Sequence, residues 1–132
     1  STPLADVLGC AGRVGTKGFV FLDSPGYDPV SVTGQIASGA QIVVFTTGRG
    51  SAFGSKPAPT IKLATNDMLY HAMPDDMDLH GGEVRSAGVR LDAKGDEILD
   101  EILAVASGKP SRSEALGLGD SEFVPWQVGA VM

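Results

Sequence analysis

The chain has 132 residues, of which 42% are hydrophobic, 20% are charged and 6% are aromatic. This length fits a single domain, and the hydrophobic fraction is too high for a disordered chain. We expect no membrane span, because no apolar run reaches about 18 residues, and no secretion leader. Sixteen acidic residues against ten basic ones give a net charge of −6, which argues against nucleic acid and anionic membrane surfaces as partners.

Cysteine and glycine are the two residue types whose numbers stand out. Cys10 is the single cysteine, so no internal disulfide can form, and a cytoplasmic location is expected. Glycine accounts for 18 of the 132 residues and shows no period. The glycines cluster beside apolar runs, which predicts tight turns and close approach of the backbone to a ligand.

The first elements predicted along the chain are a helical turn, a strand and a helix. Residues 3–8 are expected to form one helical turn. The wholly apolar run within 18–22 predicts a strand that is buried on both faces. Asp28 and Pro29 predict the cap and the first turn of a helix over 30–40.

A second apolar run predicts a strand over 41–46, which completes a βαβ unit whose parallel strands are neighbours in one sheet. The later elements are a strand over 60–65, a helix capped by Asn66 or Asp67, a short strand over 77–80, an amphipathic helix over 93–107 with Leu99 and Leu103 in its apolar stripe, a helix capped by Ser111 or Ser113, and an extended edge segment over 123–128. Together they predict one α/β domain over 1–132. We expect a three-layer, mostly parallel sheet with helices on both faces, as in Rossmann-like and flavodoxin-like folds.

The strongest candidate site is the glycine-rich loop that follows the second apolar strand. Its members are Thr46, Thr47, Gly48, Arg49, Gly50 and Ser51, and Lys56 follows in the same long loop. In open parallel sheets, ligands bind beyond the carboxyl ends of the strands. Glycines let backbone amides approach an anion, hydroxyls add donors, and Arg49 can hold a carboxylate through two parallel hydrogen bonds. The loop predicts a binding site for a small anion, and the alternative is a surface loop with a solvated arginine.

Motifs for nucleotides and for serine hydrolysis are absent from this region. The loop lacks the spacing of a P-loop and the third glycine of a dinucleotide fingerprint. No Gly-x-Ser-x-Gly elbow surrounds Ser51 or Ser55, which argues against a serine hydrolase. Lys62 interrupts an apolar strand, so it either has a charged partner or points outward from a sheet edge.

Carboxylates and histidines elsewhere in the chain offer two further candidate sites. Asp23 ends the first predicted strand, so we expect it beside the Thr46–Ser51 loop, where it could accept a proton, bind a metal or hold a hydroxyl. A simple turn is the alternative for Asp23. His71 and His80 flank an acidic run, but their spacing matches no zinc motif, so no metal site is expected within this chain alone.

Several segments resemble the C-terminal part of the altronate and galactarate dehydratases. These segments are Phe21-Leu22-Asp23-Ser24-Pro25-Gly26-Tyr27-Asp28, Thr33-Gly34-Gln35-Ile36-Ala37-Ser38-Gly39-Ala40, Phe45-Thr46-Thr47-Gly48-Arg49-Gly50-Ser51 and Pro59-Thr60-Ile61-Lys62, continued by Met77-Asp78 and Ala104-Val105-Ala106-Ser107-Gly108. The motifs occur in order over roughly residues 17–109, most of the chain.

The resemblance implies a hydro-lyase that removes water from a sugar acid, such as altronate or galactarate, and forms a 2-keto-3-deoxy acid. It also implies a divalent metal, typically iron, and a much longer polypeptide. We therefore expect the chain to be the C-terminal fragment of a dehydratase, with N-terminal and middle regions as its partners and a homo-oligomer as a further expectation. The catalytic base and the metal ligands are expected in those other regions.

The alternative function is a non-catalytic domain that binds a small anion or serves in assembly. Such a domain would use the same glycine-rich loop only to bind or to pack against a partner. The two hypotheses differ in the need for a base and a metal-ligand set, and this chain displays neither motif in its sequence.

Overall fold

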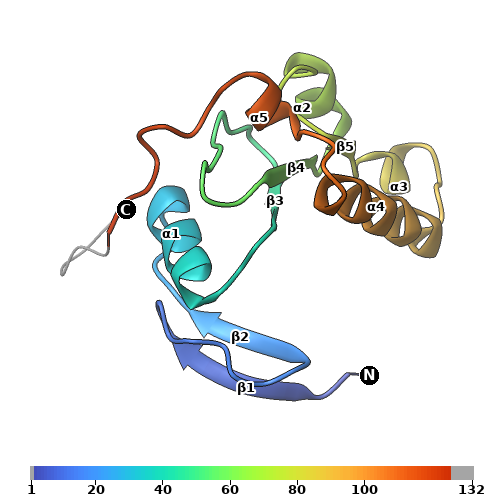
Figure 1. The fold of residues 1–132 in the computed structure, drawn as a ribbon. Coiled ribbons are helices and arrows are strands. Elements are labelled where there is room, and N and C mark those ends of the chain that lie inside the picture. Colours follow the sequence, from blue (N-terminus) through green and yellow to red (C-terminus); the bar gives the residue numbers. More distant parts are fainter. Residues whose placement is uncertain (1, 126–132) are drawn as a thin grey trace. The chain divides into compact units, whose positions relative to one another are not determined.

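The structure is a computed structural model that describes residues 2–125 of the chain. It divides into two compact units, Ser1–Gln41 with Ser121–Met132 (unit one) and Ile42–Asp120 (unit two). Unit one holds a two-stranded parallel sheet and unit two a three-stranded parallel sheet. The α/β class and the parallel pairing are confirmed, but the expected single three-layer sheet is not observed, because the strands belong to two small sheets (Figure 1).

Unit one begins with strand β1 (Leu4–Gly9), which pairs in parallel with β2 (Phe19–Asp23). The prediction of a helical turn over 3–8 is therefore wrong. Apolar residues at positions 4, 7 and 8 fit a helical spacing, and so short a run does not separate helix from strand. Because Leu4–Gly9 pairs with β2, this segment forms a strand.

The sheet of unit one is covered on one face only. Val20 and Leu22 of β2 are half-buried, whereas Phe19 and Phe21 are 59% and 53% exposed. The prediction that this strand is buried on both faces is wrong, because side chains alternate along a strand and α1 (Asp28–Ser38) lies over only one side of the sheet (Figure 1).

Helix α1 confirms the local signals that predict it. Pro29 lies in its first turn, and Gly39 ends it with a left-handed backbone (φ 116°) whose N–H bonds the carbonyls of Gln35 and Ile36. Asp28 is the first helical residue and not the cap, since Tyr27 occupies the capping position. A Pro at the start and a Gly at the end therefore bound this helix.

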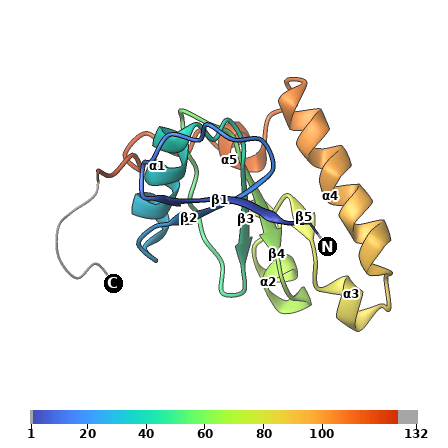
Figure 2. The same cartoon turned by 90° about the horizontal axis from the view of Figure 1, so that it is seen from below.

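Unit two contains β3 (Val43–Thr47), β4 (Thr60–Ala64) and β5 (Leu79–His80), in the order β3-β4-β5. The helices are α2 (Asp67–Ala72), α3 (Glu83–Ser86), α4 (Leu91–Ala106) and α5 (Arg112–Ala115). Figures 1 and 2 show α2 leaving the carboxyl end of β4 and the long α4 beside the short β5. The predicted caps Asn66 and Ser111 are confirmed, and Ser111 forms a reciprocal capping box with Glu114.

The predicted βαβ unit is not formed within one sheet. The strand before α1 pairs with β1, and the strand after α1 pairs with β4. The expectation that β2 and β3 are neighbours is therefore wrong. Each strand finds its partner in its own unit, and strand pairing is a long-range choice that a local pattern does not specify.

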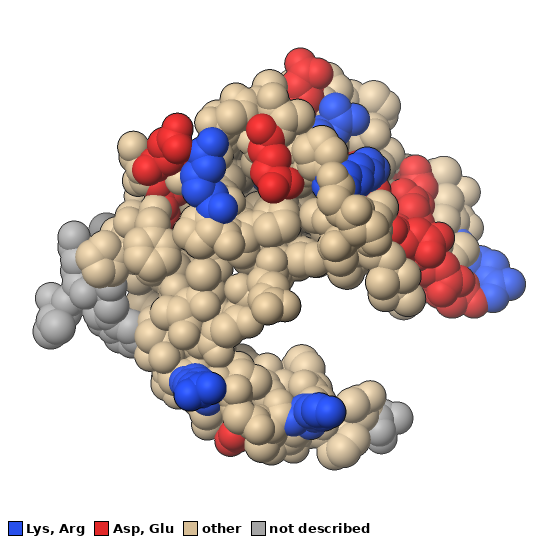
Figure 3. Space-filling model, viewed as in Figure 1, with Lys and Arg blue, Asp and Glu red and all other residues tan. Residues whose placement is uncertain are grey.

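Two apolar clusters form the core of unit two. Ile61, Leu79 and Val105 form one with the half-buried Ile42, Leu63, Ile98 and Ile102, and Ala64, Leu69 and Met77 form the other with Tyr70 and Met73. The apolar stripe of α4 is confirmed only in part, because Leu99 and Leu103 are more than half exposed. Acidic side chains run along the outside of α4 (Figure 3).

The chain after α5 forms no regular element up to Pro125. The expected extended edge segment over 123–128 extends past Pro125, so its last part lies outside the described residues. Within residues 2–125, no helix is both long enough and apolar enough to cross a membrane.

Candidate functional site

The carboxyl ends of the three strands of unit two meet at one edge of the sheet, because all three strands are parallel. β3 ends at Thr47, β4 at Ala64 and β5 at His80. This edge is where open parallel sheets bind their ligands. The loops that leave it carry Gly48, Asn66 and the glycine pair that follows His80.

Two side chains that follow β4 hold the loop that leaves β3. Thr65 Oγ1 donates a hydrogen bond to the Thr47 carbonyl (3.1 Å), and Asn66 Nδ2 donates one to the Gly48 carbonyl (2.9 Å). Asn66 Oδ1 also accepts from the Leu69 amide (2.9 Å), which caps α2. Asn66 thus ties two loops together, whereas its sequence signal indicates only a helix cap.

The Thr46–Ser51 loop is shaped by its own hydroxyls. Thr47 Oγ1 accepts from the Gly50 amide (3.1 Å), and Ser51 Oγ accepts from the Phe53 amide (3.1 Å). Each hydroxyl keeps its own hydrogen for a ligand. Gly50 has φ 103°, and a Cβ there would lie 2.5 Å from Met73 Sδ, so the loop runs tightly over α2.

Arg49 is the free cation of this loop. Its side chain is exposed and forms no ion pair or hydrogen bond within residues 2–125. Lys56, by contrast, forms an exposed ion pair with Asp120 (3.6 Å). Within the described residues, Arg49 is thus unpaired, whereas Lys56 has a charged partner of its own, and Thr46 and Thr47 are the last residues of β3.

Lys62 anchors the end of the same loop from inside the protein. It is fully buried, and its Nζ donates to the Ser51 carbonyl (3.1 Å) and to Asp76 Oδ1 (3.3 Å). Of the two alternatives for Lys62, the structure shows the paired one. Because a buried ammonium needs such partners, the position of Ser51 depends on Lys62.

The later part of the long loop is packed against the segment around α5. Ser113 Oγ donates to the Phe53 carbonyl (3.1 Å). Gly119 has φ 106°, and a Cβ there would lie 3.0 Å from backbone atoms of Gly54, Ser55 and Lys56. This part of the loop is therefore closely packed against the segment around α5.

His80 lies between two carboxylates at the end of β5. Its Nε2 is 2.8 Å from Asp67 Oδ1, its Nδ1 is 3.3 Å from Glu83 Oε2, and its ring stacks on Tyr70 with centroids 4.3 Å apart. Within residues 2–125, no group of three or more His, Cys, Asp or Glu is arranged to hold a metal ion. His80 therefore acts here as a partner of carboxylates.

Hydrogen bonds lower the pKa of both carboxyl groups beside His80. The pKa of Asp67 lies below its ordinary value because Ser86, and after it His80, donate to the carboxylate. The pKa of Glu83 is lowered mainly by Lys94, whose Nζ lies 2.6 Å from Glu83 Oε1. Burial alone would lower the pKa of Lys94, but its hydrogen bonds to Glu83 and Glu97 outweigh burial and raise it.

A lowered carboxyl pKa in the folded state makes the stability of the chain sensitive to acid. The contribution of Asp67 is present above its unfolded pKa, about 4, and is lost as the pH falls through the lower folded value. We expect the free energy of unfolding, measured by urea titration between pH 7 and pH 2, to fall less steeply below pH 4 in Asp67→Asn than in wild type. The exposed control Asp75→Asn should follow the wild-type curve, and a common slope for all three proteins would contradict this prediction.

A polar pocket of about 320 Å³ lies at the ends of β4 and β5. Thr65, Asn66, Asp67, Gly82, Arg85 and Ser86 line it. Sequence reasoning missed this pocket, because residues 83–92 are polar and rich in turn formers. The signal that could have found it is the pair of glycines directly after a short strand, which places the following residues at the carboxyl edge of the sheet.

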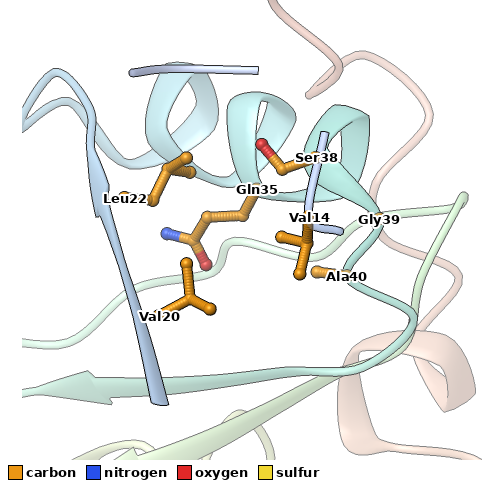
Figure 4. A pocket seen from close by; sticks show the side chains of 7 residues that line it. All are labelled: Val14, Val20, Leu22, Gln35, Ser38, Gly39 and Ala40. Atoms are coloured by element: carbon orange, nitrogen blue, oxygen red, sulfur yellow. The ribbon is translucent and has the colours of Figure 1, made fainter. Parts of the chain in front are cut away.

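Unit one has a larger and more apolar pocket of about 470 Å³. It is lined by Val14, Val20, Leu22, Gln35, Ser38, Gly39 and Ala40, with the Gln35 amide directed toward the two β2 side chains (Figure 4). Asp23 ends β2 and is exposed. β2 and β3 are not in one sheet, so pairing of these strands does not place Asp23 beside the Thr46–Ser51 loop as expected. A role for Asp23 in catalysis stays a prediction.

Unit two is thus a small α/β unit with polar loops at the carboxyl edge of a parallel sheet. The family described as D-galactarate/Altronate dehydratase, C-terminal, matches residues 1–131. The chain belongs to this family.

Three relatives are similar over most of the chain. Altronate dehydratase of Bacillus subtilis (strain 168) is 39% identical over 108 residues, which are 82% of this chain and 22% of that protein. Galactarate dehydratase (L-threo-forming) of Escherichia coli (strain K12) is 36% identical over 106 residues, 80% of this chain and 20% of that protein. The (2R)-sulfolactate sulfo-lyase subunit beta of Chromohalobacter salexigens is 34% identical over 107 residues, 81% of this chain and 27% of that subunit. The chain therefore spans only about a fifth to a quarter of the length of these relatives.

Proposed function

We propose that this chain is the C-terminal domain, residues 1–132, of a longer hydro-lyase that dehydrates a sugar acid of the altronate or galactarate type to a 2-keto-3-deoxy acid. The observation that carries the proposal is the similarity of nearly the whole chain to altronate and galactarate dehydratases. The polar edge of unit two, where Arg49 is unpaired within residues 2–125, supports a role in binding the acid.

Dehydration of a hydroxy acid requires removal of a weakly acidic proton next to a carboxylate. The carboxylate must be held while negative charge develops on it, and an acid must assist the departing hydroxyl. Arg49 can hold the carboxylate, with the hydroxyl hydrogens of Thr46, Thr47 and Ser51 as further donors. Gly48 and Gly50 let the backbone come close, and Lys56 can add positive charge. Asp23 is the candidate catalytic carboxylate of the chain.

The resemblance also implies a divalent metal ion, with iron the expected one. The described residues do not by themselves fit a metal ion, since no group of three or more potential ligands is arranged for it within residues 2–125. We infer that its ligands come from the rest of the longer polypeptide.

The apolar face of the unit-one sheet supports an association with those other regions. Leu4, Val7, Phe19 and Phe21 are all more than half exposed. Parallel sheets are normally covered on both faces, and exposed apolar patches commonly mark interfaces. Coverage by the N-terminal and middle regions of a longer cytoplasmic protein, or by a second copy in a homo-oligomer, would bury these side chains.

The experiment compares the full-length polypeptide with residues 1–132 alone, both supplied with divalent iron. We expect the full-length protein to form a 2-keto-3-deoxy acid from altronate or galactarate, and we expect residues 1–132 alone to form none. Product formation is measured directly by chromatography. Turnover by the isolated 132 residues would contradict the proposal that part of the active site lies in the other regions of the polypeptide. The absence of turnover of either acid by the full-length protein would contradict the proposed hydro-lyase function.

The second candidate function is a non-catalytic domain that binds a small anion or serves in assembly. The polar pocket and Arg49, which has no partner in the described part of the chain, favour it, because binding needs no base or metal. Binding of a sugar acid by the full-length protein, without turnover when iron is supplied, would favour this alternative over the hydro-lyase.

A further inference from the structure

We propose that the polar pocket at the ends of β4 and β5 holds the second anionic group of the substrate, and that Arg85 is the residue that binds it. The substrate class is then a hydroxy acid with an anion at each end, such as a dicarboxylic sugar acid. The choice of a sugar acid rests on the proposed function, whereas the pocket and its free arginine rest on the structure alone.

Asn66 lies between the loop that follows β3 and the loop that follows β5. On one side, its Nδ2 donates to the Gly48 carbonyl (2.9 Å). On the other side, a Cβ on Gly82 would lie only 2.6 Å from the Asn66 carbonyl carbon, so the loop after β5 passes in direct contact. The loops that carry Arg49 and Arg85 therefore flank the same residue.

The carboxylates near the pocket are already engaged by other side chains of unit two. Asp67 is engaged by His80 (2.8 Å), and Glu83 is engaged by Lys94 (2.6 Å) and by His80 (3.3 Å). The nearby carboxylates thus already have partners.

Arg85 lines the pocket, is exposed, and has no ion pair or hydrogen bond from its side chain within the described part of the chain. It is the cation left for a ligand.

The hydrogen-bonding groups that line the pocket match those of a hydroxy acid. A guanidinium binds a carboxylate through two parallel hydrogen bonds. Thr65 Oγ1 donates to the Thr47 carbonyl and keeps lone pairs that can accept from a substrate hydroxyl. Gly82 packs directly against Asn66 and Asp67 and so closes one side of the pocket. The pocket therefore offers a cation for the acid group and an acceptor for a neighbouring hydroxyl.

The test uses the full-length polypeptide with galactarate, which has two carboxylates, and altronate, which has one. Binding is measured by calorimetry and turnover by product formation. Wild type should bind galactarate at least about tenfold more tightly than altronate. In Arg85→Gln, the Kd and KM for galactarate should rise at least about thirtyfold, the lower end of the scale for removing one side of a charged pair, while the values for altronate stay unchanged. Arg112→Gln is the control, because Arg112 is exposed, lies in the same unit and has no side-chain partner within residues 2–125.

Each outcome separates the pocket from the proposed function. Equal losses for both acids in Arg85→Gln, no loss for either, or wild-type binding of neither acid would overturn the assignment of the pocket. Unchanged circular dichroism and melting temperature are required of both variants, and Arg85→Lys, which keeps the charge, should retain part of the galactarate preference. Arg85-dependent binding of galactarate without any turnover would uphold the pocket and overturn only the hydro-lyase function.

Discussion

Replacing Arg49 by alanine in the full-length polypeptide is expected to lower kcat/KM for the sugar acid by an amount equivalent to about 2–5 kcal/mol, the scale for removing one partner of a buried charge pair. Arg49 is exposed and unpaired within the described residues, on a loop at the carboxyl edge of a parallel sheet. A bound carboxylate would provide its partner. The measurement is steady-state kinetics with each acid.

Two further variants test whether the effect is specific to the guanidinium group of Arg49. Arg49→Lys keeps the charge but loses the two-pronged geometry, so it should recover only part of the lost activity. Arg90→Ala removes an exposed arginine that pairs with Asp92 elsewhere in unit two, and it should change kcat/KM by less than about 0.5 kcal/mol. If Arg49→Ala behaves like Arg90→Ala while the fold is intact by circular dichroism, Arg49 does not bind the substrate.

Replacing Lys62 by methionine is expected to lower the free energy of unfolding by about 3 kcal/mol, the scale for breaking a buried ion pair from one side. Methionine keeps most of the side-chain volume, so the loss comes from Asp76 and from the Ser51 carbonyl, which both lose their donor. Denaturant titration measures it. Because the Ser51 carbonyl is released as well, substrate binding by the Thr46–Ser51 loop should weaken in the same variant.

The matched control is Lys109→Met, since Lys109 is a half-exposed lysine that pairs with Glu101 (2.6 Å). This substitution should lower the free energy of unfolding by less than about 1 kcal/mol, because surface ion pairs contribute no more than that. Adding Asp76→Asn to Lys62→Met should restore part of the lost stability, because no unpaired charge then remains. Equal losses of unfolding free energy in Lys62→Met and Lys109→Met would show that the buried contacts of Lys62 stabilise the protein no more than a surface ion pair does.

Local chemistry in the sequence was sufficient to predict most elements of unit two. Asn66 and Ser111 belong to residue types that cap helices well, and apolar runs of β-branched residues commonly form strands. For the same reason Pro29 and Gly39 located α1 correctly. The family could also be inferred from motifs, because their order along the chain is itself the signal.

Strand partners and the exposure of side chains required the tertiary structure. Whether β2 pairs with β1 or with β3 depends on contacts between segments far apart in the chain, and the local pattern of Phe19–Leu22 is the same in both cases. That choice exposes Phe19 and Phe21, and it removes the reason for placing Asp23 beside the Thr46–Ser51 loop.

The candidate site divides in the same way between sequence and structure. The sequence determined that Thr46–Ser51 is a glycine-rich segment at a strand end, because residue type and order alone define it, although Thr46 and Thr47 themselves belong to β3. Only the tertiary structure decided that Lys62 holds this loop from a fully buried position and that Arg85 lines a pocket beside it. The physical reason is that a charged side chain acquires its role from the partners that folding brings to it, and those partners come from distant positions in the chain.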